Sequence, residues 1–496
     1  MTAHAFYRNK CVSGDCYKEK NFLSDFKKIG KESNMKKLMK IMALAMSCAM
    51  VFGAVACGGN PPPPPSDVTY SVQFDQLDAN LTGEVRILKP TNDLEDDIMN
   101  AAIAGFKTKY PKVTFKQETV DIGKYNEQIT KLNSIDNLPD ILWTDSSKTY
   151  SLKAMDIALN LDYLMDDATE AGVIDAENDF TPEFNAMGTY KGVRYAIPRT
   201  ADSIVTFYNK TEMDAAGVDM TQYNDGWTWT QFLSVCETLR NHYDSQSKPT
   251  YYPIQPNLNW DANAWAIVKS LGGEIISEDG EWSGALTQAK ASEIYDFVHN
   301  LVTSDYIPDI AAGETFTNSF ESGNCPMLFQ STTIANYEGI LAVKEAGFDI
   351  VPFPLINGEN SAIGSGYAGY ALNKDIVKDQ NKLNIAGAFL AYMMSYDGQQ
   401  KLAKDGKMTN PSIRLDLGVD NADAEWHKKY AANYNVGAYT WGGQYKVEVE
   451  FANYVDAKYV PGVMGAMVSF VGGDCVEKAK LEAYNSYNTK MARVFI

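Results

Sequence analysis

The sequence predicts an α/β protein that is divided into two or three domains. Three observations support this fold class. Short strand-like and helix-like patterns alternate from residue 84 onward. About 430 residues follow the proline run Pro61–Pro65, which is more than one compact core usually holds. The chain contains no internal repeat.

The first strand and helix follow this proline run. Residues Glu84–Leu88 are β-like in composition, and Asn92 followed by Glu95 is typical of a helix N-terminus. The apolar residues that follow share one helical face: Leu94, Ile98, Ala102 and Phe106. Pro111 ends the predicted helix, and the alternation that begins at Val113 predicts the next strand.

A further helical stretch leads to a short apolar strand at Pro139–Trp143. Strands that alternate with helices indicate a parallel sheet, and ligands bind such sheets beyond the carboxyl ends of the strands. This rule directs attention to Asn92 after the first strand, and to Thr144 and Asp145 after the third.

A lipoprotein export signal precedes the predicted folded part. Three lysines form its basic start, an uncharged run of 15 residues covers 41–55, and small side chains lead to Cys57. The run is shorter than the ~20 residues that a transmembrane helix needs. The segment resembles a bacterial lipobox, which implies that Cys57 is acylated; a cleaved signal with an incidental cysteine is the alternative.

We expect residues 1–34 to be a mis-assigned extension, because a complete signal begins with its own methionine at position 35. The signal peptide then covers 35–56. The lipidated cysteine and a proline-rich linker cover 57–83, and such a linker holds a globular body away from a membrane.

The charge of the mature chain argues against nucleic-acid binding. Removal of residues 1–56 takes away 10 basic and 4 acidic residues, which leaves 34 basic and 59 acidic residues and a formal net charge of -25. Nucleic-acid binding depends on phosphate neutralisation by Lys and Arg, and no basic cluster follows the signal. The acidity favours solubility and is also compatible with a cationic ligand.

Motifs for catalysis and metal binding are missing from the mature sequence. Its three histidines, His242, His299 and His427, are widely separated, and neither HExxH, GxSxG nor GxxxxGK[ST] occurs. We therefore expect no metal, no cofactor and no enzymatic activity. Paired carboxylates for glycoside hydrolysis stay open as an alternative, because their separation is spatial. Cys236 shares a helical face with apolar residues, which predicts a buried, inert thiol.

The stretch Tyr190–Lys210 contains an apolar strand that is interrupted at 198–202 and then resumes, which predicts a chain crossing between two lobes. Other short motifs lie before and after it in a defined order: Pro139–Ser147, Gly226–Leu239, Ser319–Thr332, Gly364–Lys374 and Tyr396–Ser412. With the lipoprotein start, this series resembles the extracellular solute-binding proteins of ABC importers. The similarity is strongest to the carbohydrate-binding group that includes maltose-binding protein.

The resemblance implies a type II fold like that of periplasmic binding proteins, with two α/β lobes, a three-crossing hinge and a ligand cleft between the lobes. The crossings would lie near residues 198–202, 330–332 and 364–367. The N-terminal lobe would combine residues 84–200 with 332–365, and the C-terminal lobe 201–331 with 366–496. Gly364 and Gly366 suit a hinge because glycine accepts unusual backbone angles; an ordinary loop is the alternative.

Sugar recognition requires flat apolar faces for the sugar ring and planar polar groups for its hydroxyls. Trp260 and Trp441 are the predicted aromatic platforms, because each lies among turn residues; core packing is the alternative for both. Asp202 matches the position at the first crossing where the resemblance implies a ligand-contacting acid. Capping roles are the alternatives for Asp202 and Asp145. Position in the motifs adds Asn92, Thr144, Arg199, Ser331 and Tyr367.

The mechanism implied by the resemblance is binding, hinge closure and presentation of the closed lobes to a permease. We therefore expect a monomeric lipoprotein on the extracellular face of the cell membrane. Its partners would be an oligosaccharide, an ABC permease, and the membrane through the lipid on Cys57, without nucleic acid. A cationic ligand such as a polyamine, and a surface glycan-binding role without a transporter, are the alternatives.

Overall fold

The computed structural model describes residues 68–145, 148–181, 184–185, 187–190, 192–258, 261–274, 284–309, 318–330, 334–355, 362–408, 410–439, 446–448, 480–482, 484–486 and 488–489. These residues belong to one compact unit, Asp67–Ile496. Within them, every helix is too short or too polar to cross a membrane.

The larger of the described sheets has six strands in the order β12–β11–β3–β1–β2, with β6 paired to β11. The strands are β1 (Gly83–Pro90), β2 (Val113–Val120), β3 (Ile141–Asp145), β6 (Ile197–Ser203), β11 (Ala362–Leu372) and β12 (Lys446–Glu448). β1 is parallel to β2 and β3, whereas β11 is antiparallel to β3 and β6. The sheet is therefore mixed.

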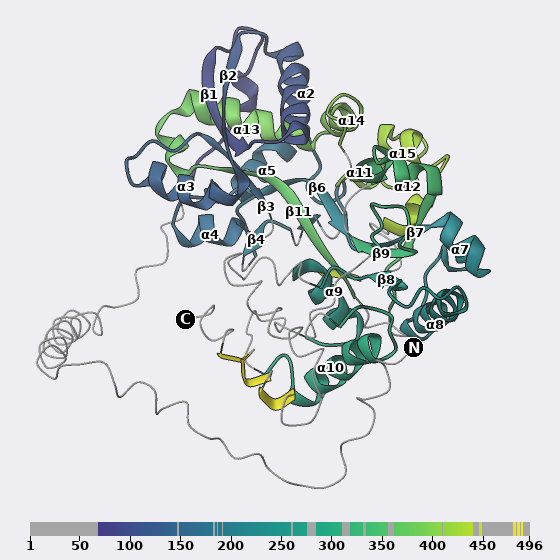
Figure 1. Ribbon diagram of the computed structural model, residues 1–496. Helices are drawn as coiled ribbons and strands as arrows, with labels where there is room; N and C mark the ends of the chain where they lie inside the picture. Colours follow the sequence, from purple (N-terminus) through teal and green to yellow (C-terminus); the bar gives the residue numbers. More distant parts are fainter. Residues whose placement is uncertain are drawn as a thin grey trace, which may run out of the picture. The chain divides into compact units, whose positions relative to one another are not determined.

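Helices cover both faces of this sheet. Ile87 and Leu88 are neighbours in β1 that point to opposite faces, and both are at most 1% exposed. The helices in this part of the chain are α2 (Asp93–Lys109), α3 (Tyr125–Asn133), α4 (Thr149–Ala154), α5 (Asp162–Glu170), α13 (Gln380–Met394) and α14 (Tyr396–Lys404). α13 lies against β1, and α14 lies against α2, although about 300 residues of sequence separate them (Figure 1).

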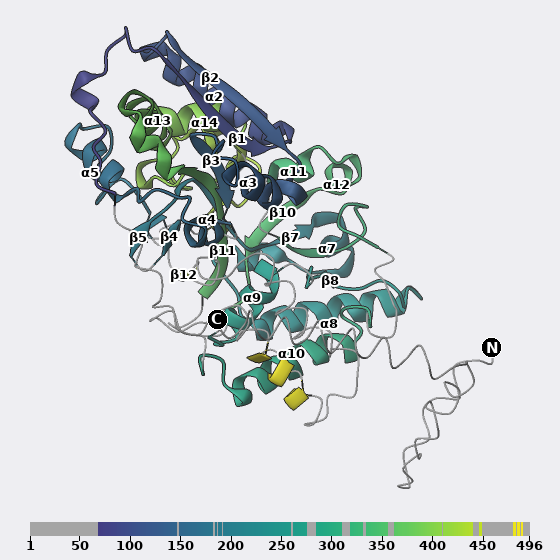
Figure 2. The same ribbon diagram turned by 90° about the vertical axis from the view of Figure 1, so that its left-hand side faces the viewer.

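A second sheet has four described strands in the order β10–β7–β9–β8. They are β7 (Val205–Asn209), β8 (Ile254–Gln255), β9 (Met327–Gln330) and β10 (Phe348–Pro352). The helices in this part, which Figure 2 shows from another side, are α7 (Lys210–Ala216), α8 (Trp229–Ser245), α9 (Asp261–Ser270), α10 (Gln288–Thr303), α11 (Ile334–Glu338), α12 (Leu341–Ala346) and α15 (Glu425–Tyr430). A capping box of Thr228 and Gln231 starts α8, within the motif Gly226–Leu239.

The remaining described elements are short. β4 (Thr189–Tyr190) and β5 (Val193–Arg194) form a small hairpin. Single 3-10 turns are η2 (Phe74–Gln76), η3 (Ile122–Lys124), η4 (Met220–Tyr223), η5 (Lys374–Lys378), η6 (Leu415–Leu417) and η7 (Val436–Tyr439).

The predicted order of strand, helix, strand and strand is confirmed by β1, α2, β2 and β3. The interruption predicted at residues 198–202 is wrong, because these residues lie inside β6. Pairing with β11 overrides the local signal of Pro198, and a register shift leaves Arg199 as the extra residue of a β-bulge. Gly364 and Gly366 likewise lie inside β11 and not in a loop.

Gly369 makes the bulge possible. A Cβ at this position would lie only 2.1 Å from the backbone oxygen of Ile197. Only glycine therefore lets β11 approach β6 this closely. The bulge fixes the register of the β6 residues that follow it, including Asp202.

Candidate ligand-binding site

The strand register brings several predicted site residues to one end of the six-stranded sheet. Asp145 at the end of β3 lies opposite Ala368 of β11, and Ala368 lies opposite Thr200 of β6. Asp202 is two residues further along β6 and pairs with Gly366. With strands about 4.8 Å apart and about 3.4 Å per residue, the backbones of Asp145 and Asp202 are roughly 12 Å apart.

The Asp145 carboxylate is partly exposed and charge-paired. Its side chain is 23% exposed, and the Lys148 ammonium donates to Oδ2 at 2.5 Å. The same ammonium lies 5.3 Å from the centre of the Trp143 ring. Asp145 and Lys148 thus place an acceptor and a cationic donor beside an aromatic ring, a combination that can recognise hydroxyl groups.

Buried hydroxyl groups hold the turn between β3 and α4, which carries Asp145 and Lys148, in position. Thr144 and Thr149 exchange a hydrogen bond between their Oγ1 atoms at 3.0 Å, and Thr149 Oγ1 also shares a 2.5 Å hydrogen bond with the Tyr367 hydroxyl. Tyr367 is 3% exposed, and burial raises the pKa of its phenol well above the ordinary value. The chain of hydroxyls ties the start of α4 to β11, so Tyr367 fixes the position of the turn that carries Asp145.

The Arg199 side chain is turned away from solvent. It is 5% exposed and forms an ion pair with Glu95, to which the Tyr370 hydroxyl also donates at 3.2 Å. Asn92 is exposed and accepts from the backbone N–H of Glu95 at 2.8 Å, so it caps α2. The side chains of Arg199 and Asn92 therefore both contact α2.

Several predicted positions lie outside the described residues, namely Cys57, Trp260, Ser331 and Trp441. Asp202 is described by its backbone. Among the residues that the structure describes, Thr144, Asp145 and Tyr367 are brought together at the edge formed by β3, α4 and β11.

Sequence reasoning did not identify Lys148 or Thr149 as members of this group. Lys148 follows Asp145 by three residues. The fold of the turn brings the two side chains into an ion pair, and the Trp143 ring lies beside the Lys148 ammonium. Glu95 was expected to mark the helix start, and its carboxylate instead pairs with Arg199 from a distant strand. No local pattern reports contacts of this kind.

Metal-binding and thiol chemistry find no support in this part of the chain. Within the described ranges, no group of three or more His, Cys, Asp and Glu residues is placed to hold a metal ion. Cys236 is a free, buried cysteine, as predicted, and so is Cys325. Burial raises the pKa of Cys325 to about 12, which keeps this thiol protonated at neutral pH.

The sheets and the helix layers define an α/β protein with the type II periplasmic fold. The family model of the bacterial extracellular solute-binding proteins matches residues 92–400, which is more than half of the chain. The chain therefore belongs to this family. Its members are binding proteins, and this protein is accordingly a solute-binding protein and not an enzyme.

Solved structures share the fold at low sequence identity. The chain is similar to the cyclic α-maltosyl-1,6-maltose binding protein from Arthrobacter globiformis, with 16% identity, a TM-score of 0.65, and coverage of 83% of this chain and 100% of that chain. The sugar-binding protein MalE from Xanthomonas citri has 15% identity, a TM-score of 0.64, and coverage of 83% and 98%.

The GacH receptor of Streptomyces glaucescens, solved with and without acarbose, has 18% identity, a TM-score of 0.60, and coverage of 84% of this chain and 100% of that chain. These similarities confirm the predicted type II fold. A search of curated protein sequences gives no match.

Proposed function

We propose that this protein is a lipid-anchored extracellular binding protein that captures an oligosaccharide and delivers it to an ABC permease. The observation that carries the proposal is the strand end where Asp145, Lys148 and Trp143 meet and where Asp202 lies two strands away. The carboxylate and the ammonium provide an acceptor and a donor, two of the groups that a sugar requires, and the buried Trp143 ring lies against the ammonium.

The proposed roles divide the predicted residues into contacting and supporting groups. Asp145 and Asp202 accept hydrogen bonds from sugar hydroxyls, and Thr144 and Tyr367 hold the turn that positions Asp145. Asn92 and Arg199 fix the start of α2 beside this edge. Trp260 and Trp441 are proposed as ring platforms and Ser331 as a further hydroxyl contact.

The ligands of similar proteins support the choice of a carbohydrate. The Arthrobacter protein is a binding protein for cyclic α-maltosyl-1,6-maltose, and the GacH receptor was solved with acarbose. In the proposed mechanism the sugar binds between the predicted lobes, 84–200 with 332–365 and 201–331 with 366–496. A ligand that prefers the closed form by about 5.5 kcal/mol is sufficient to convert a mostly open population into a mostly closed one.

A thermal-shift screen tests the ligand class. The purified protein is measured with mono-, di- and oligosaccharides, with spermidine, and with amino acids, because a ligand of the native state must raise the melting temperature. We expect a saturable shift with an oligosaccharide, and recovery of that sugar without chemical change. A shift with spermidine alone would replace the proposed ligand by a cation.

The proposed contacts are tested with the sugar that the screen finds. Asp145→Asn and Asp202→Asn are each expected to weaken binding by about 10- to 100-fold, because each loses a hydrogen bond to a charged acceptor. Glu127→Gln, an exposed acid on α3, is the control and keeps the affinity. Unchanged affinity in both aspartate variants contradicts the proposed site.

The proposed anchor is tested separately. Cells are labelled with palmitate, and the label is followed in the wild-type protein and in Cys57→Ser. We expect label and membrane association in the wild type, and loss of both in the variant. Release of an unlabelled wild-type protein into the medium would show that Cys57 is an incidental cysteine.

A further inference from the structure

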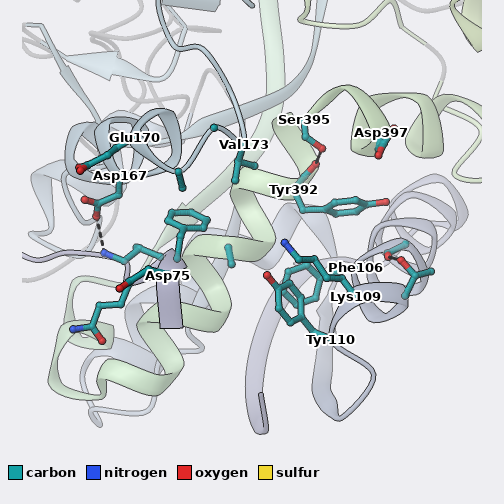
Figure 3. A pocket seen from close by; sticks show the side chains of 18 of the residues that line it. Asp75, Phe106, Lys109, Tyr110, Asp167, Glu170, Val173, Tyr392, Ser395 and Asp397 are labelled. Atoms are coloured by element: carbon teal, nitrogen blue, oxygen red, sulfur yellow. Dashed lines mark hydrogen bonds between the residues drawn. The ribbon is translucent and has the colours of Figure 1, made fainter. Parts of the chain in front are cut away.

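A second polar region lies at the opposite end of α2 from the candidate site. It is a cavity of about 960 Å³ between the C-terminal ends of α2, α5 and α13 and the segment 71–75 (Figure 3). The 17 residues of α2 span about 25 Å at 1.5 Å per residue, so this length separates the cavity from Asn92. None of the residues predicted to bind a ligand lines it.

One wall of the cavity presents hydrogen-bond donors from α2 and the residue after it. Tyr110 is 5% exposed, and its hydroxyl has no hydrogen-bond partner among the described residues. The neighbouring Lys109 ammonium lies 5.3 Å from the centre of the Tyr110 ring and has no carboxylate partner in the described part of the chain. Figure 3 shows both side chains pointing toward the middle of the cavity.

The opposite wall presents acceptors. Asp75 and Glu170 line it, and neither carboxylate forms a hydrogen bond or an ion pair with any residue that the structure describes. Asp167, between them, is already occupied, since Oδ2 accepts from the backbone N–H of Val72 at 2.6 Å and Oδ1 from Ser71 Oγ at 3.3 Å. The bound Asp167 holds the segment 71–75 in place and leaves the other two carboxylates available.

Aromatic rings complete the lining. Phe74 and Tyr392, which are half-buried, contribute apolar surface between the donor wall and the acceptor wall. The Phe106 and Tyr392 ring centroids are 6.1 Å apart, so the buried Phe106 packs against Tyr392 and joins α2 to α13.

The two walls restrict the ligands that fit. Four carboxylates line the cavity, those of Asp75, Asp167, Glu170 and Asp397, against the single ammonium of Lys109, so the lining repels an anion. An apolar ligand would leave the Tyr110 hydroxyl and these charges without partners. A hydroxyl group can both donate and accept, so a polyhydroxylated ligand satisfies both walls while its C–H faces lie on the rings. The volume is within the range of pockets that bind such small molecules.

We propose that this cavity is a second carbohydrate-binding site, which takes a neutral oligosaccharide independently of the candidate site at the strand ends. Tyr110 and Lys109 donate to sugar hydroxyls, and Asp75 and Glu170 accept from them. The proposal does not depend on the proposed transport function, because the two sites share no residue.

Calorimetric titration of the purified protein tests this proposal. Maltotriose, cellotriose and isomaltotriose are the probes, and Asp145→Asn is the background variant that weakens the first site. We expect at least one trisaccharide to bind saturably to this variant. Adding Tyr110→Phe or Lys109→Met weakens that binding about five- to tenfold, the effect of one lost hydrogen bond.

Two measurements separate binding from structure. The Tyr110 hydroxyl has no partner within the described protein, so Tyr110→Phe leaves the melting temperature unchanged. Tyr396→Phe and Lys107→Met are matched controls outside the lining and keep the affinity for the trisaccharide.

Three results would overturn the proposal. They are absence of saturable binding of all three trisaccharides to Asp145→Asn, trisaccharide binding that Tyr110→Phe and Lys109→Met leave unchanged, and binding of spermidine that Asp75→Asn and Glu170→Gln abolish. Failure of the proposed transport function would be recognised differently. In that case neither Asp145→Asn nor Asp202→Asn would change the affinity for any ligand that the wild-type protein binds.

Discussion

The two sheets differ in the contacts that join distant segments around each of them. Around the six-stranded sheet, buried polar pairs link distant segments and add to aromatic contacts such as Phe106 with Phe389: Arg199 of β6 pairs with Glu95 of α2, and Tyr367 of β11 with Thr149 of α4. Around the four-stranded sheet, aromatic rings do this, and Trp229 alone contacts Phe232, Phe297, Phe329 and Phe353 in edge-on geometry.

This difference predicts different sensitivities. Aromatic packing depends on volume and ring geometry, so loss of a whole ring is costly. A buried polar network depends on the pairing of single atoms, so an isosteric change that removes one partner is sufficient to damage it. The candidate site lies on the polar sheet, where positions are specified atom by atom.

The largest effect is expected from Trp229→Ala in the aromatic core. Trp229 is 5% exposed, and its Nε1 donates to Ser270 Oγ at 3.0 Å. We expect a loss of about 3–5 kcal/mol in the free energy of unfolding, measured by urea denaturation. Leu341→Ala, at a side chain that is 68% exposed, is the control and should change stability by less than about 0.5 kcal/mol. A similar loss in both variants would contradict the prediction.

Arg199→Met tests the buried pair of the polar sheet. The variant leaves the Glu95 carboxylate buried without its counter-charge, and we expect a loss of about 3 kcal/mol in urea denaturation. The double variant Arg199→Met with Glu95→Leu removes both charges and should recover to within about 1 kcal/mol of the wild type. If the double variant is as unstable as the sum of the single ones, the pair is not coupled.

Tyr367→Phe removes one hydroxyl from the chain beneath Asp145. It should cost about 1 kcal/mol in stability, and Thr149→Val should cost a similar amount. Because each change breaks the same hydrogen bond, the double variant should lose less than the sum, which a double-mutant cycle measures. Strict additivity would show that the two hydroxyls act independently.

The smallest effect is expected at the surface pair of Arg86 and Glu118, whose Nε and Oε1 atoms are 2.8 Å apart. The hydrogen bond from Arg86 lowers the pKa of Glu118 below its ordinary value of 4.5. Because the folded-state pKa is depressed, the pair stabilises the fold above this value and loses its effect as the pH falls. Glu118→Gln should cost a few tenths of a kcal/mol at pH 7 and nothing near pH 2. If the loss of stability in Glu118→Gln is the same at pH 7 and near pH 2, it is not caused by loss of the Arg86–Glu118 pair.

Local patterns predicted the elements whose signals lie in consecutive residues. The apolar stripe that begins after Asn92 defined α2, and Asn92 does cap this helix. Thr228 and Gln231, three residues apart, form the capping box that starts α8. In both places the stabilising contacts connect residues three or four positions apart, so the sequence is sufficient to reveal them.

Long-range pairing was not accessible in this way. Pro198 and the polar residues after it suggest a break, and only the hydrogen bonds to β11 make them a strand. The same limit applies to the partners of predicted site residues, since Lys148 and Thr149 gain their roles from a turn and from a strand more than 200 positions away.

The sequence by itself determined the α/β alternation and the polar residues at the strand ends, because these depend on order and short spacings, and its ordered motifs gave the resemblance that predicted the class of the protein. The tertiary structure decided that Asp145 is paired with Lys148, that Tyr367 supports it from beneath, and that Arg199 is committed to Glu95. Lys148 is close to Asp145 in the chain, but the contacts of Tyr367 and Arg199 span 218 and 104 positions, and no local pattern signals them because register and bulge geometry arise only when the strands pair.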